Sequence, residues 1–379
     1  MTEIRVINKD EIINSIKLLI YNDSPSLLEK INFDDDTIYL EPLLFSYFNC
    51  KKDDFFSKEV LEEILQGYYI NKEELKIEYS YNKNGIVYVP KRGYFKKQSK
   101  RAFLPIAFIN GTSIEIIKYS HPLIDSVFKI GSDNKINENN IKFNEDVYNQ
   151  NIGFLKNAFD FIKLSSKKHY DLIEQCCKKV VLFETDPENI NSFATINAHG
   201  IAFFNTYQKD YDEVFFVDDI THQTGHIILT TILFKRKDYF LINENENIKI
   251  ITKNKREYRS FYILFHALYT YYSSLTCLDN CIEYKCFNKR QTYEAKGRIG
   301  FYINKCLLDL SNFEKVVKHF KGIENVLTKE GIDLFNEIKN KLIEVINKWY
   351  SITIIFHYNN QPYNFTYSEF IKLNPTTDA

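Results

Sequence analysis

Two apolar stripes near the end of the chain constrain its fold more than any other feature. Apolar side chains recur every three or four residues from Ile303 to Phe320, and again from Ile332 to Trp349. That spacing places them on one face of an α-helix, which is stable only when another element covers it. Thr328 precedes the second stripe and is a suitable N-cap residue. The sequence therefore predicts that the C-terminal third is mainly helical and that both stripes lie in the core.

The first 145 residues show a different, mixed pattern. Apolar residues at helical spacing come first, and runs rich in β-branched and aromatic residues follow between residues 75 and 129. Asn and Gly residues interrupt these runs at two places, which is typical of β-hairpin turns. The predicted elements are two helices, Glu11–Tyr21 and Ser57–Gly67, and two hairpins, Ile77–Tyr81 with Gly85–Val89 and Phe103–Ile109 with Ser113–Tyr119.

A polar stretch, Gly131–Asp146, separates this region from the rest of the chain. It contains seven Asn or Asp residues and is the best linker candidate. We therefore expect an α+β fold in three parts: an N-terminal mixed α/β region with hairpins over 1–145, a mainly helical metal-binding domain over 146–350, and a terminal strand pair or tail over 351–379. After the linker the sequence predicts helices at Ile152–Leu164 and His169–Lys179, then extended segments at Val180–Glu184 and Phe193–Phe204.

Charge and targeting patterns narrow the class of protein. The 49 Lys and Arg residues nearly balance the 50 Asp and Glu residues, for a formal net charge of −1. A protein that grips nucleic acid relies on a basic field, so we expect no nucleic-acid partner. The N-terminus lacks a secretory signal pattern, and no apolar run reaches the roughly 20 residues that a membrane span needs. Seven cysteines, an odd number, do not indicate a disulfide framework, so the expected location is the cytoplasm, away from membranes.

The segment Asp218–His226 carries the pattern with the most chemical content. His222 and His226 are four residues apart, and in a helix this spacing lets both side chains reach one metal ion. Two aspartates just before them suit the first turn of such a helix. The β-branched run Ile227–Ile232 equally permits a strand, in which residues four apart also share a face. Two histidines are too few for a metal site, so a third ligand is needed.

His266 is the candidate third ligand. It lies in the amphipathic stretch Arg259–Tyr269, where a lone histidine is more often a satisfied core residue than a metal ligand. Arg259 precedes it by seven residues, which is two helical turns, so the two side chains would share one face.

Taken together, these segments resemble a known family, the HExxH-motif proteins encoded in gene clusters for ribosomally made, modified peptides. Members carry a motif of the type HEFQH before an apolar run, which His222–Leu233 resembles. Further along they carry a stretch of the type PRPLSGLLHGAYAF, and Tyr258–Tyr271 has the same seven-residue spacing from Arg to His. Ser192–Ala202 and Leu327–Gly331 are similar to two further segments of the family. The resemblance covers roughly residues 150–348, about half of the chain.

The family is one of iron- and 2-oxoglutarate-dependent peptide β-hydroxylases, so the resemblance implies a non-haem iron site. It implies that His222, His226 and His266 hold Fe(II). Such oxygenases usually present two histidines and one carboxylate, which leaves Glu294 as the alternative third ligand. Zinc is the alternative metal.

The resemblance also implies a cosubstrate and a partner. The distal carboxylate of 2-oxoglutarate needs a cation, and Arg259 is the candidate, with Arg256 and Arg298 as alternatives. The expected substrate is a precursor peptide that becomes hydroxylated at a β-carbon. Residues 1–145 would recognise its leader, for example by adding a strand to an exposed edge of the predicted Leu75–Tyr119 sheet. No feature of the sequence predicts the oligomeric state.

One departure from the family bears on the chemistry. Gln223 stands where the motif has glutamate. In a zinc peptidase that glutamate is the base that activates water, and an amide cannot accept the proton. Peptidase chemistry is therefore disfavoured, whereas an oxygenase does not need this base. Gln223 and Glu294 remain the candidate catalytic residues, and the alternative is an inactive, zincin-like scaffold that binds metal or peptide.

Overall fold

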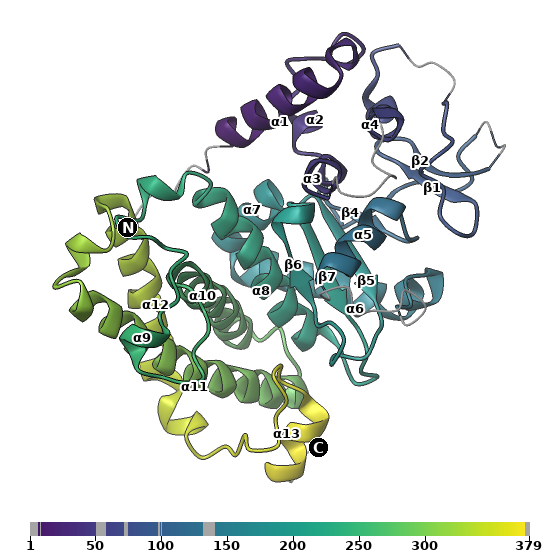
Figure 1. The fold of residues 1–379 in the computed structure, drawn as a ribbon. Coiled ribbons are helices and arrows are strands. Elements are labelled where there is room, and N and C mark those ends of the chain that lie inside the picture. Colours follow the sequence, from purple (N-terminus) through teal and green to yellow (C-terminus); the bar gives the residue numbers. More distant parts are fainter. Residues whose placement is uncertain are drawn as a thin grey trace. The chain divides into compact units, whose positions relative to one another are not determined.

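The computed structural model describes residues 7, 9–50, 58–71, 75–97, 99, 101–131 and 141–375. The chain divides into two compact units, one of Met1–Lys156 with Leu172–Lys209 and one of Asn157–Asp171 with Asp210–Ala379. The first unit is mixed α/β and the second is mainly helical, as Figure 1 shows, so the predicted α+β class is confirmed. Most of the predicted linker, residues 132–140, lies outside the described residues, as do Met1–Arg5.

A five-stranded sheet forms the centre of the first unit. Its strand order is β3-β4-β5-β7-β6, with β4, β5 and β7 parallel and the two edge strands antiparallel to their neighbours. The labelled strands β4 to β7 lie side by side in Figure 1. A separate antiparallel pair is β1 with β2. The strands are β1 (Ile86–Val89), β2 (Gly93–Lys96), β3 (Ala107–Phe108), β4 (Glu115–Ile117), β5 (Lys179–Phe183), β6 (Phe193–Ala194) and β7 (Ile201–Asn205).

Seven helices accompany these sheets within the described residues. The predicted helix at Glu11–Tyr21 is confirmed as α1, and the described part of Ser57–Gly67 is helical in α4. The last two helices, α6 and α7, each contribute residues to both units. The helices are α1 (Asp10–Asp23), α2 (Asp36–Tyr39), α3 (Pro42–Asn49), α4 (Lys58–Leu65), α5 (Pro122–Gly131), α6 (Glu145–Ser165) and α7 (Lys167–Cys176).

The first hairpin pairs differently from the prediction. β1 pairs with β2, and Ile77–Tyr81 forms no strand. The reason is the buried carboxylate of Glu63, which accepts hydrogen bonds from the backbone N–H groups of residues 78, 79 and 80 at 2.6–3.0 Å. These donors are therefore used by a side chain and cannot pair with a strand. The second predicted hairpin is confirmed, as β3 with β4, but it is shorter than the apolar runs suggested.

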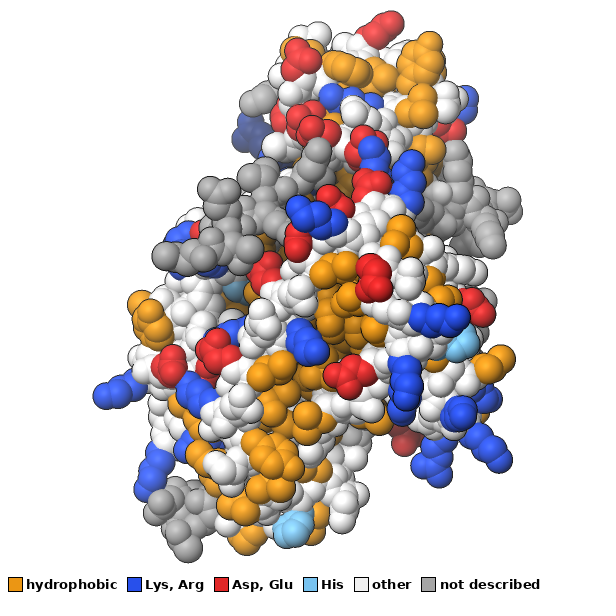
Figure 2. All heavy atoms as spheres, turned by 90° about the vertical axis from the view of Figure 1, so that its left-hand side faces the viewer, with side chains coloured by type: hydrophobic (Ala, Val, Ile, Leu, Met, Phe, Trp, Pro, Cys, Tyr) orange, Lys and Arg blue, Asp and Glu red, His pale blue; other side chains and the backbone are white. Residues whose placement is uncertain are grey.

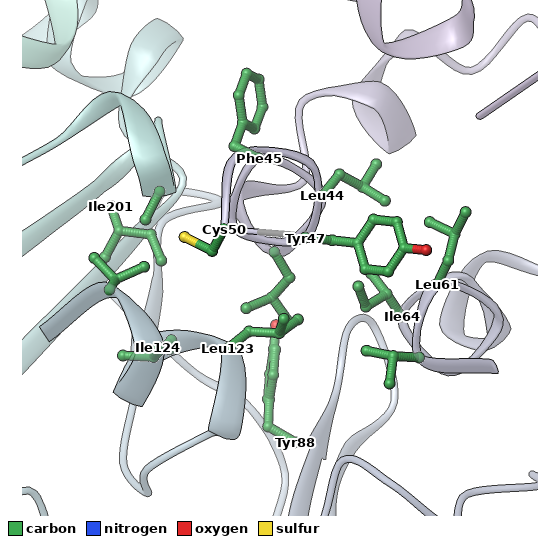
Figure 3. Close-up of a cluster of buried hydrophobic side chains, with 14 of the residues drawn as sticks. Leu44, Phe45, Tyr47, Cys50, Leu61, Ile64, Tyr88, Leu123, Ile124 and Ile201 are labelled. Carbon is green, nitrogen blue, oxygen red and sulfur yellow. The ribbon is translucent and has the colours of Figure 1, made fainter. Parts of the chain in front are cut away.

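The core of the first unit gathers around α3. Figure 3 shows this helix nearly end-on, with Leu44 and Tyr47 directed toward Leu61 and Ile64 of α4. Ile201 of β7 lies on the other side of α3, in the same buried cluster. Because α3 contacts both α4 and the sheet side of the unit, it joins the N-terminal helices to the sheet through a single apolar core.

The second unit is a helical assembly in which α10 packs against α8, α11 and α12. The segment that permitted either a strand or a helix is helical, within α8. Both apolar stripes of the C-terminal third are confirmed as core-facing helices, and Thr328 is the N-cap of α12. The helices are α8 (Glu213–Ile232), α9 (Lys249–Thr252), α10 (Phe261–Glu283), α11 (Lys289–His319), α12 (Lys329–Thr353) and α13 (Tyr367–Leu373).

The terminal segment differs from the expected strand pair or tail. α12 continues to Thr353, and Tyr367–Leu373 is the helix α13. The Asn374 amide exchanges two hydrogen bonds of 2.8 Å with the backbone N–H and C=O of His357, which a strand partner would otherwise take. Phe365 and Phe370 are buried against Phe301, so this segment is held by an aromatic cluster rather than by a β-ladder.

The described surface carries mixed charge. The face drawn in Figure 2 carries Lys and Arg as well as Asp and Glu side chains, and hydrophobic side chains gather in a band along its middle and lower part. This face presents no large field of one sign, in keeping with the net charge of −1. No described helix combines the length and the apolar character needed to cross a membrane.

Candidate metal centre

Helix α8 places the two histidines of the HQTGH segment on one face. The side chain of its N-cap, Asp212, accepts a hydrogen bond of 2.9 Å from the backbone N–H of Val214, and Arg290 pairs with the same carboxylate. The helix then runs unbroken through the segment. The ring centroids of His222 and His226 are 5.2 Å apart, as expected for residues one turn apart.

Gly225 allows α10 to approach this part of α8 closely. A Cβ atom at this position would lie 3.2 Å from Oγ of Ser273 and 3.4 Å from Cγ2 of Thr270, both on α10. The helix contact therefore has little space for a larger side chain. It brings the next residue, His226, against the helix that carries His266.

His226 and His266 meet across this contact. Their Nδ1 atoms are 3.4 Å apart, and the rings are stacked with centroids 5.6 Å apart and an angle of 16° between their planes. Tyr262 packs one turn before His266, at 4.4 Å between ring centroids. The guanidinium of Arg236 lies 3.9 Å from the centre of the Tyr262 ring. The structure thus brings His222, His226 and His266 into one continuous group of rings.

The environment keeps these imidazoles neutral. Burial lowers the pKa of each of the three histidines to about 3, with a further contribution from Lys305 at His222, from His222 at His226, and from His226 at His266. Nδ1 of His222 and Nε2 of His266 are buried without a hydrogen-bond partner. Neutral imidazole is the form that binds a metal ion, and an unpartnered buried nitrogen is costly unless something occupies it.

One pair of ring nitrogens has the spacing that two ligands of one metal ion would have. Two imidazole nitrogens that each lie about 2.1 Å from one tetrahedral ion are separated by about 3.4 Å. That is the separation of the two Nδ1 atoms of His226 and His266. Among the residues that the structure describes, no group of three or more His, Cys, Asp or Glu side chains is arranged so that it could hold a metal ion.

Gln223 follows His222 in the chain, but its side chain forms its hydrogen bond with Asp219. It is buried, and its Nε2 donates a hydrogen bond of 3.0 Å to Oδ1 of Asp219, one turn earlier on α8. As a neutral amide it supplies no base at this position.

Glu294 belongs to a buried ion-pair chain. Its carboxylate accepts two hydrogen bonds from Arg298, at 2.9 and 2.7 Å, and pairs with Arg290 at 3.1 Å. Arg298 also reaches Asp218 of α8 at 2.9 Å. Burial raises the pKa of Glu294, an effect that Arg298 opposes. The ion pairs of Glu294 therefore lie within α11 and include none of the three histidines, and Arg298 is the residue that joins α11 to α8.

Arg259 is held between two carboxylates. Its guanidinium donates to Glu257 at 2.9 and 2.7 Å and to Asp309 at 2.8 and 2.6 Å. Both carboxylates are buried, whereas the Arg259 side chain keeps 30% of its surface exposed. The arginine that the resemblance suggests for 2-oxoglutarate thus already has two anionic partners.

The residues missed by sequence reasoning lie on α11. The ring of Tyr302 stacks on His222, with centroids 6.1 Å apart and 24° between the planes. Burial lowers the pKa of Lys305 to about 8, and this ammonium in turn helps to lower the pKa of His222. A polar stripe was visible in the sequence, because Glu294, Arg298, Tyr302, Lys305 and Asp309 recur at helical spacing among apolar residues.

No protein-family model matches the chain, and no curated protein matches it either.

Proposed function

We propose that the protein is a non-haem iron, 2-oxoglutarate-dependent oxygenase that hydroxylates a β-carbon in a ribosomally made precursor peptide. The observation that carries the proposal is the convergence of His222, His226 and His266, with two ring nitrogens 3.4 Å apart. Three neutral imidazoles leave coordination positions open for a cosubstrate and dioxygen. The resemblance of the same segments to the peptide hydroxylases selects this chemistry among those that three histidines permit.

When bound, iron supplies the redox chemistry together with 2-oxoglutarate and dioxygen. In the overall reaction one oxygen atom enters the peptide C–H bond and the other enters succinate, while the carboxyl group next to the keto carbon leaves as CO₂. The protein residues then have the tasks of holding the metal, orienting the peptide and excluding water. None of these tasks requires a base at Gln223, so the amide there is compatible with the reaction.

His266 is the third ligand that we favour over Glu294. Nδ1 of His266 lies 3.4 Å from Nδ1 of His226, a separation that one metal ion can bridge. Glu294 is already committed to Arg290 and Arg298. To reach a metal it would have to leave the buried guanidinium of Arg298 and the partly exposed guanidinium of Arg290, and the loss of the buried pair is costly.

For the distal carboxylate of 2-oxoglutarate we keep Arg259 as the proposed partner. The Arg259 side chain is 30% exposed, but an incoming carboxylate would share its guanidinium with Glu257 and Asp309. Arg298 is less suited, because it is buried between Glu294 and Asp218. A conservative Arg259→Lys change should therefore raise the KM for 2-oxoglutarate more than it lowers kcat.

The first unit is the proposed site of leader recognition. Its sheet has β3 and β6 at the edges, and each edge strand has two residues. Addition of a peptide strand next to β3 would extend the sheet through backbone hydrogen bonds. A precursor peptide without its leader should then bind more weakly to the full chain, while the leader alone should bind.

The test of the function is direct. The chain is purified without oxygen, its metal is analysed, and succinate release is measured with 2-oxoglutarate and the peptide encoded by a short neighbouring reading frame. We expect bound iron, succinate release that depends on the peptide, and a product heavier by one oxygen atom. His226→Ala should abolish all three, whereas His319→Ala, at an exposed position on α11, should change none. Unaltered protein that binds no metal, or His226→Ala protein that keeps its iron and its succinate release, would overturn the proposal.

The alternative is a zincin-like scaffold without turnover. The observation that favours it is Gln223, since loss of the motif glutamate is also how a zinc peptidase would lose activity. Stoichiometric zinc, together with no succinate release from the iron-loaded protein, would select this alternative.

A further inference from the structure

The first unit contains a pocket that neither the histidine cluster nor the proposed oxygenase function explains. Its volume is about 760 Å³, within the range of small-molecule sites. It is lined by α1, α2, the residues at the start of α3, and the first residues of β4 and β5. All of its lining residues belong to the first unit.

Three buried charges line this pocket. Lys179 is the first residue of β5, Glu115 is its partner in the register of β4, and Glu41 is the N-cap of α3. Nζ of Lys179 is 3.0 Å from Oε2 of Glu41 and 2.6 Å from Oε2 of Glu115. The three side chains are between 2% and 7% exposed. One ammonium thus faces two carboxylates in a buried place, which leaves one negative charge in excess.

Lys179 has no capacity left for an anionic ligand. Besides the two carboxylates, its ammonium donates a hydrogen bond of 2.7 Å to the hydroxyl of Tyr88, so its three protons have three acceptors. Burial alone would lower the pKa of Lys179, but the two glutamates outweigh that effect and raise it. The ammonium is therefore a fixed, saturated charge.

Glu115 is the member of this cluster that can still accept a hydrogen bond. Its Oε2 accepts from Lys179 and from the hydroxyl of Tyr88, whereas Oε1 receives no hydrogen bond within the described part of the chain. Oε2 of Glu41 accepts from Tyr68 at 2.7 Å, and its Oε1 accepts from the N–H of Leu43. The group that would complete the cluster is consequently a cationic hydrogen-bond donor at Oε1 of Glu115.

Two further lysines that line the pocket lack a negatively charged partner. Nζ of Lys9 and Nζ of Lys178 both donate to the backbone oxygen of Gln175, at 3.1 and 2.9 Å. No carboxylate pairs with either lysine within the described residues, and both lysines line the pocket. Burial lowers the pKa of Lys178, with a further contribution from Lys9. A carboxylate near these two ammonium groups would relieve their mutual repulsion.

We propose that this pocket binds a ligand of the amino-acid type, with an ammonium or guanidinium group at Glu115 and a carboxylate toward Lys9 and Lys178. The inference uses only residues of the first unit, so it stands or falls independently of the oxygenase function. A free basic amino acid and a peptide that ends in a basic residue share this chemistry.

Calorimetry with three probes of equal chain length tests the charges. 6-Aminohexanoate carries both groups, hexylamine only the ammonium, and hexanoate only the carboxylate. We expect 6-aminohexanoate to bind the full chain most tightly, hexylamine more weakly, and hexanoate at least roughly tenfold more weakly than hexylamine. Absence of binding by both amines, or hexanoate binding as tightly as hexylamine, would overturn the ammonium site. Hexylamine binding more tightly than 6-aminohexanoate would overturn the carboxylate end.

A variant then assigns the site to Glu115. Glu115→Gln leaves Lys179 with one carboxylate, Glu41, and an amide of nearly the same shape, so the unit should still fold. We expect the affinity for 6-aminohexanoate to fall by at least roughly tenfold. The matched control is Glu62→Gln, which removes a carboxylate that pairs with Lys30 at 2.6 Å on the surface. An unchanged affinity in folded Glu115→Gln protein would overturn the proposal, and the probe series on the unaltered chain decides if that variant does not fold.

Two more probes distinguish a free amino acid from a peptide as the ligand. L-lysine is the free amino acid and carries an α-ammonium group in addition, whereas acetyl-Gly-Gly-Lys with a free carboxyl end presents one ammonium and one carboxylate on a peptide. Tighter binding of the peptide indicates a peptide ligand, tighter binding of L-lysine indicates a metabolite, and failure of both would overturn the amino-acid class.

Discussion

The Nδ1 atoms of His226 and His266 lie 3.4 Å apart although the two residues are separated by 40 positions in the chain. The contact depends on α8 and α10 approaching each other closely, and Gly225 and Ser273 are the residues that set this approach. Two buried neutral rings at this distance can form one hydrogen bond, in which one Nδ1 donates and the other accepts. A cation held between the two Nδ1 atoms would replace that hydrogen bond with two coordinate bonds, and its binding would favour the folded state.

Metal removal should therefore weaken the second unit. A ligand present at 100 times its dissociation constant stabilises the folded state by about 2.7 kcal/mol, which raises the melting temperature by roughly 5–10 °C for a unit of this size. We expect Fe(II), Co(II) or Zn(II) to give this increase after treatment with a chelator, in anaerobic thermal unfolding. The increase should disappear in His226→Ala and persist in His319→Ala. A melting temperature that does not respond to any of the three ions would contradict the metal site.

Gly225 provides a test of the helix approach itself. Gly225→Leu places a side chain where a Cβ alone would already lie 3.2 Å from Oγ of Ser273, so overpacking should destabilise the protein by about 1–3 kcal/mol. The separation of the two histidines should increase, and metal affinity should fall by roughly tenfold or more. Urea unfolding and metal titration measure the two effects.

The control for this change is Gly153→Ala on α6, where a Cβ meets nothing within 4 Å. It should stabilise the protein by about 0.5–1 kcal/mol through helix propensity and leave metal affinity unchanged. If Gly225→Leu retains the metal affinity of the unaltered chain, then the helix approach does not position the histidines.

Much of the fold follows from local patterns, and the exceptions have identifiable causes. The stripe of α12 was predictable because Ile338, Leu342 and Val345 repeat at helical spacing and are all buried. The strand predicted at Ile77–Tyr81 is absent because the carboxylate of Glu63, which is distant in the sequence, accepts hydrogen bonds from its backbone N–H groups. No local pattern reveals such a partner.

The candidate site, like the fold, could be predicted from the sequence only in part. That His222 and His226 share a face follows from their spacing, but their meeting with His266 depends on the packing of α8 against α10. Tyr302 and Lys305 were missed because a polar stripe on a helix reads as solvent-facing until its partner helix is known. Their place beside His222 is a consequence of tertiary packing.

Glu294→Gln separates the two candidates for the third ligand. The amide oxygen can keep both hydrogen bonds from Arg298, but the pairing with Arg290 is lost and the buried guanidinium has less negative charge beside it, so we expect a loss of about 2–4 kcal/mol in the free energy of unfolding. The metal stoichiometry of the folded protein should be unchanged, whereas His266→Ala should lower it. Elemental analysis of both variants distinguishes the ligands, and loss of metal from folded Glu294→Gln protein would assign the third position to the carboxylate.

Arg259→Ala should be mainly a stability variant. It leaves Glu257 and Asp309 buried without their shared cation, for an expected cost of about 2–4 kcal/mol. Arg256→Ala, three residues earlier at an exposed position, should cost less than about 0.5 kcal/mol. Chemical unfolding of both variants without metal or 2-oxoglutarate gives the comparison. Equal stabilities would show that the two carboxylates do not depend on Arg259.

His169 should make the second unit sensitive to mild acid. It is 5% exposed, its Nε2 has no hydrogen-bond partner, and its ring packs edge-on against Tyr272. Burial lowers its pKa from 6.5 to about 4. Because the unfolded chain takes up a proton below pH 6.5 and the folded chain does not, the stabilising contribution is complete above pH 6.5 and is lost as the pH falls toward 4.

The expected contribution of His169 is about 1.4 kcal/mol for each pH unit in this interval, and it adds to the same effect from His222, His226 and His266, whose pKa values burial also lowers. Urea unfolding at pH 7.5 and pH 5.5 measures the loss, and His169→Phe should reduce it by about 1 kcal/mol because the ring contact with Tyr272 is kept while the titrating group is removed. His319→Phe, at an exposed site, should leave the difference between the two pH values unchanged. An equal loss in His169→Phe and in the unaltered chain would mean that other groups, and not this buried imidazole, set the acid sensitivity.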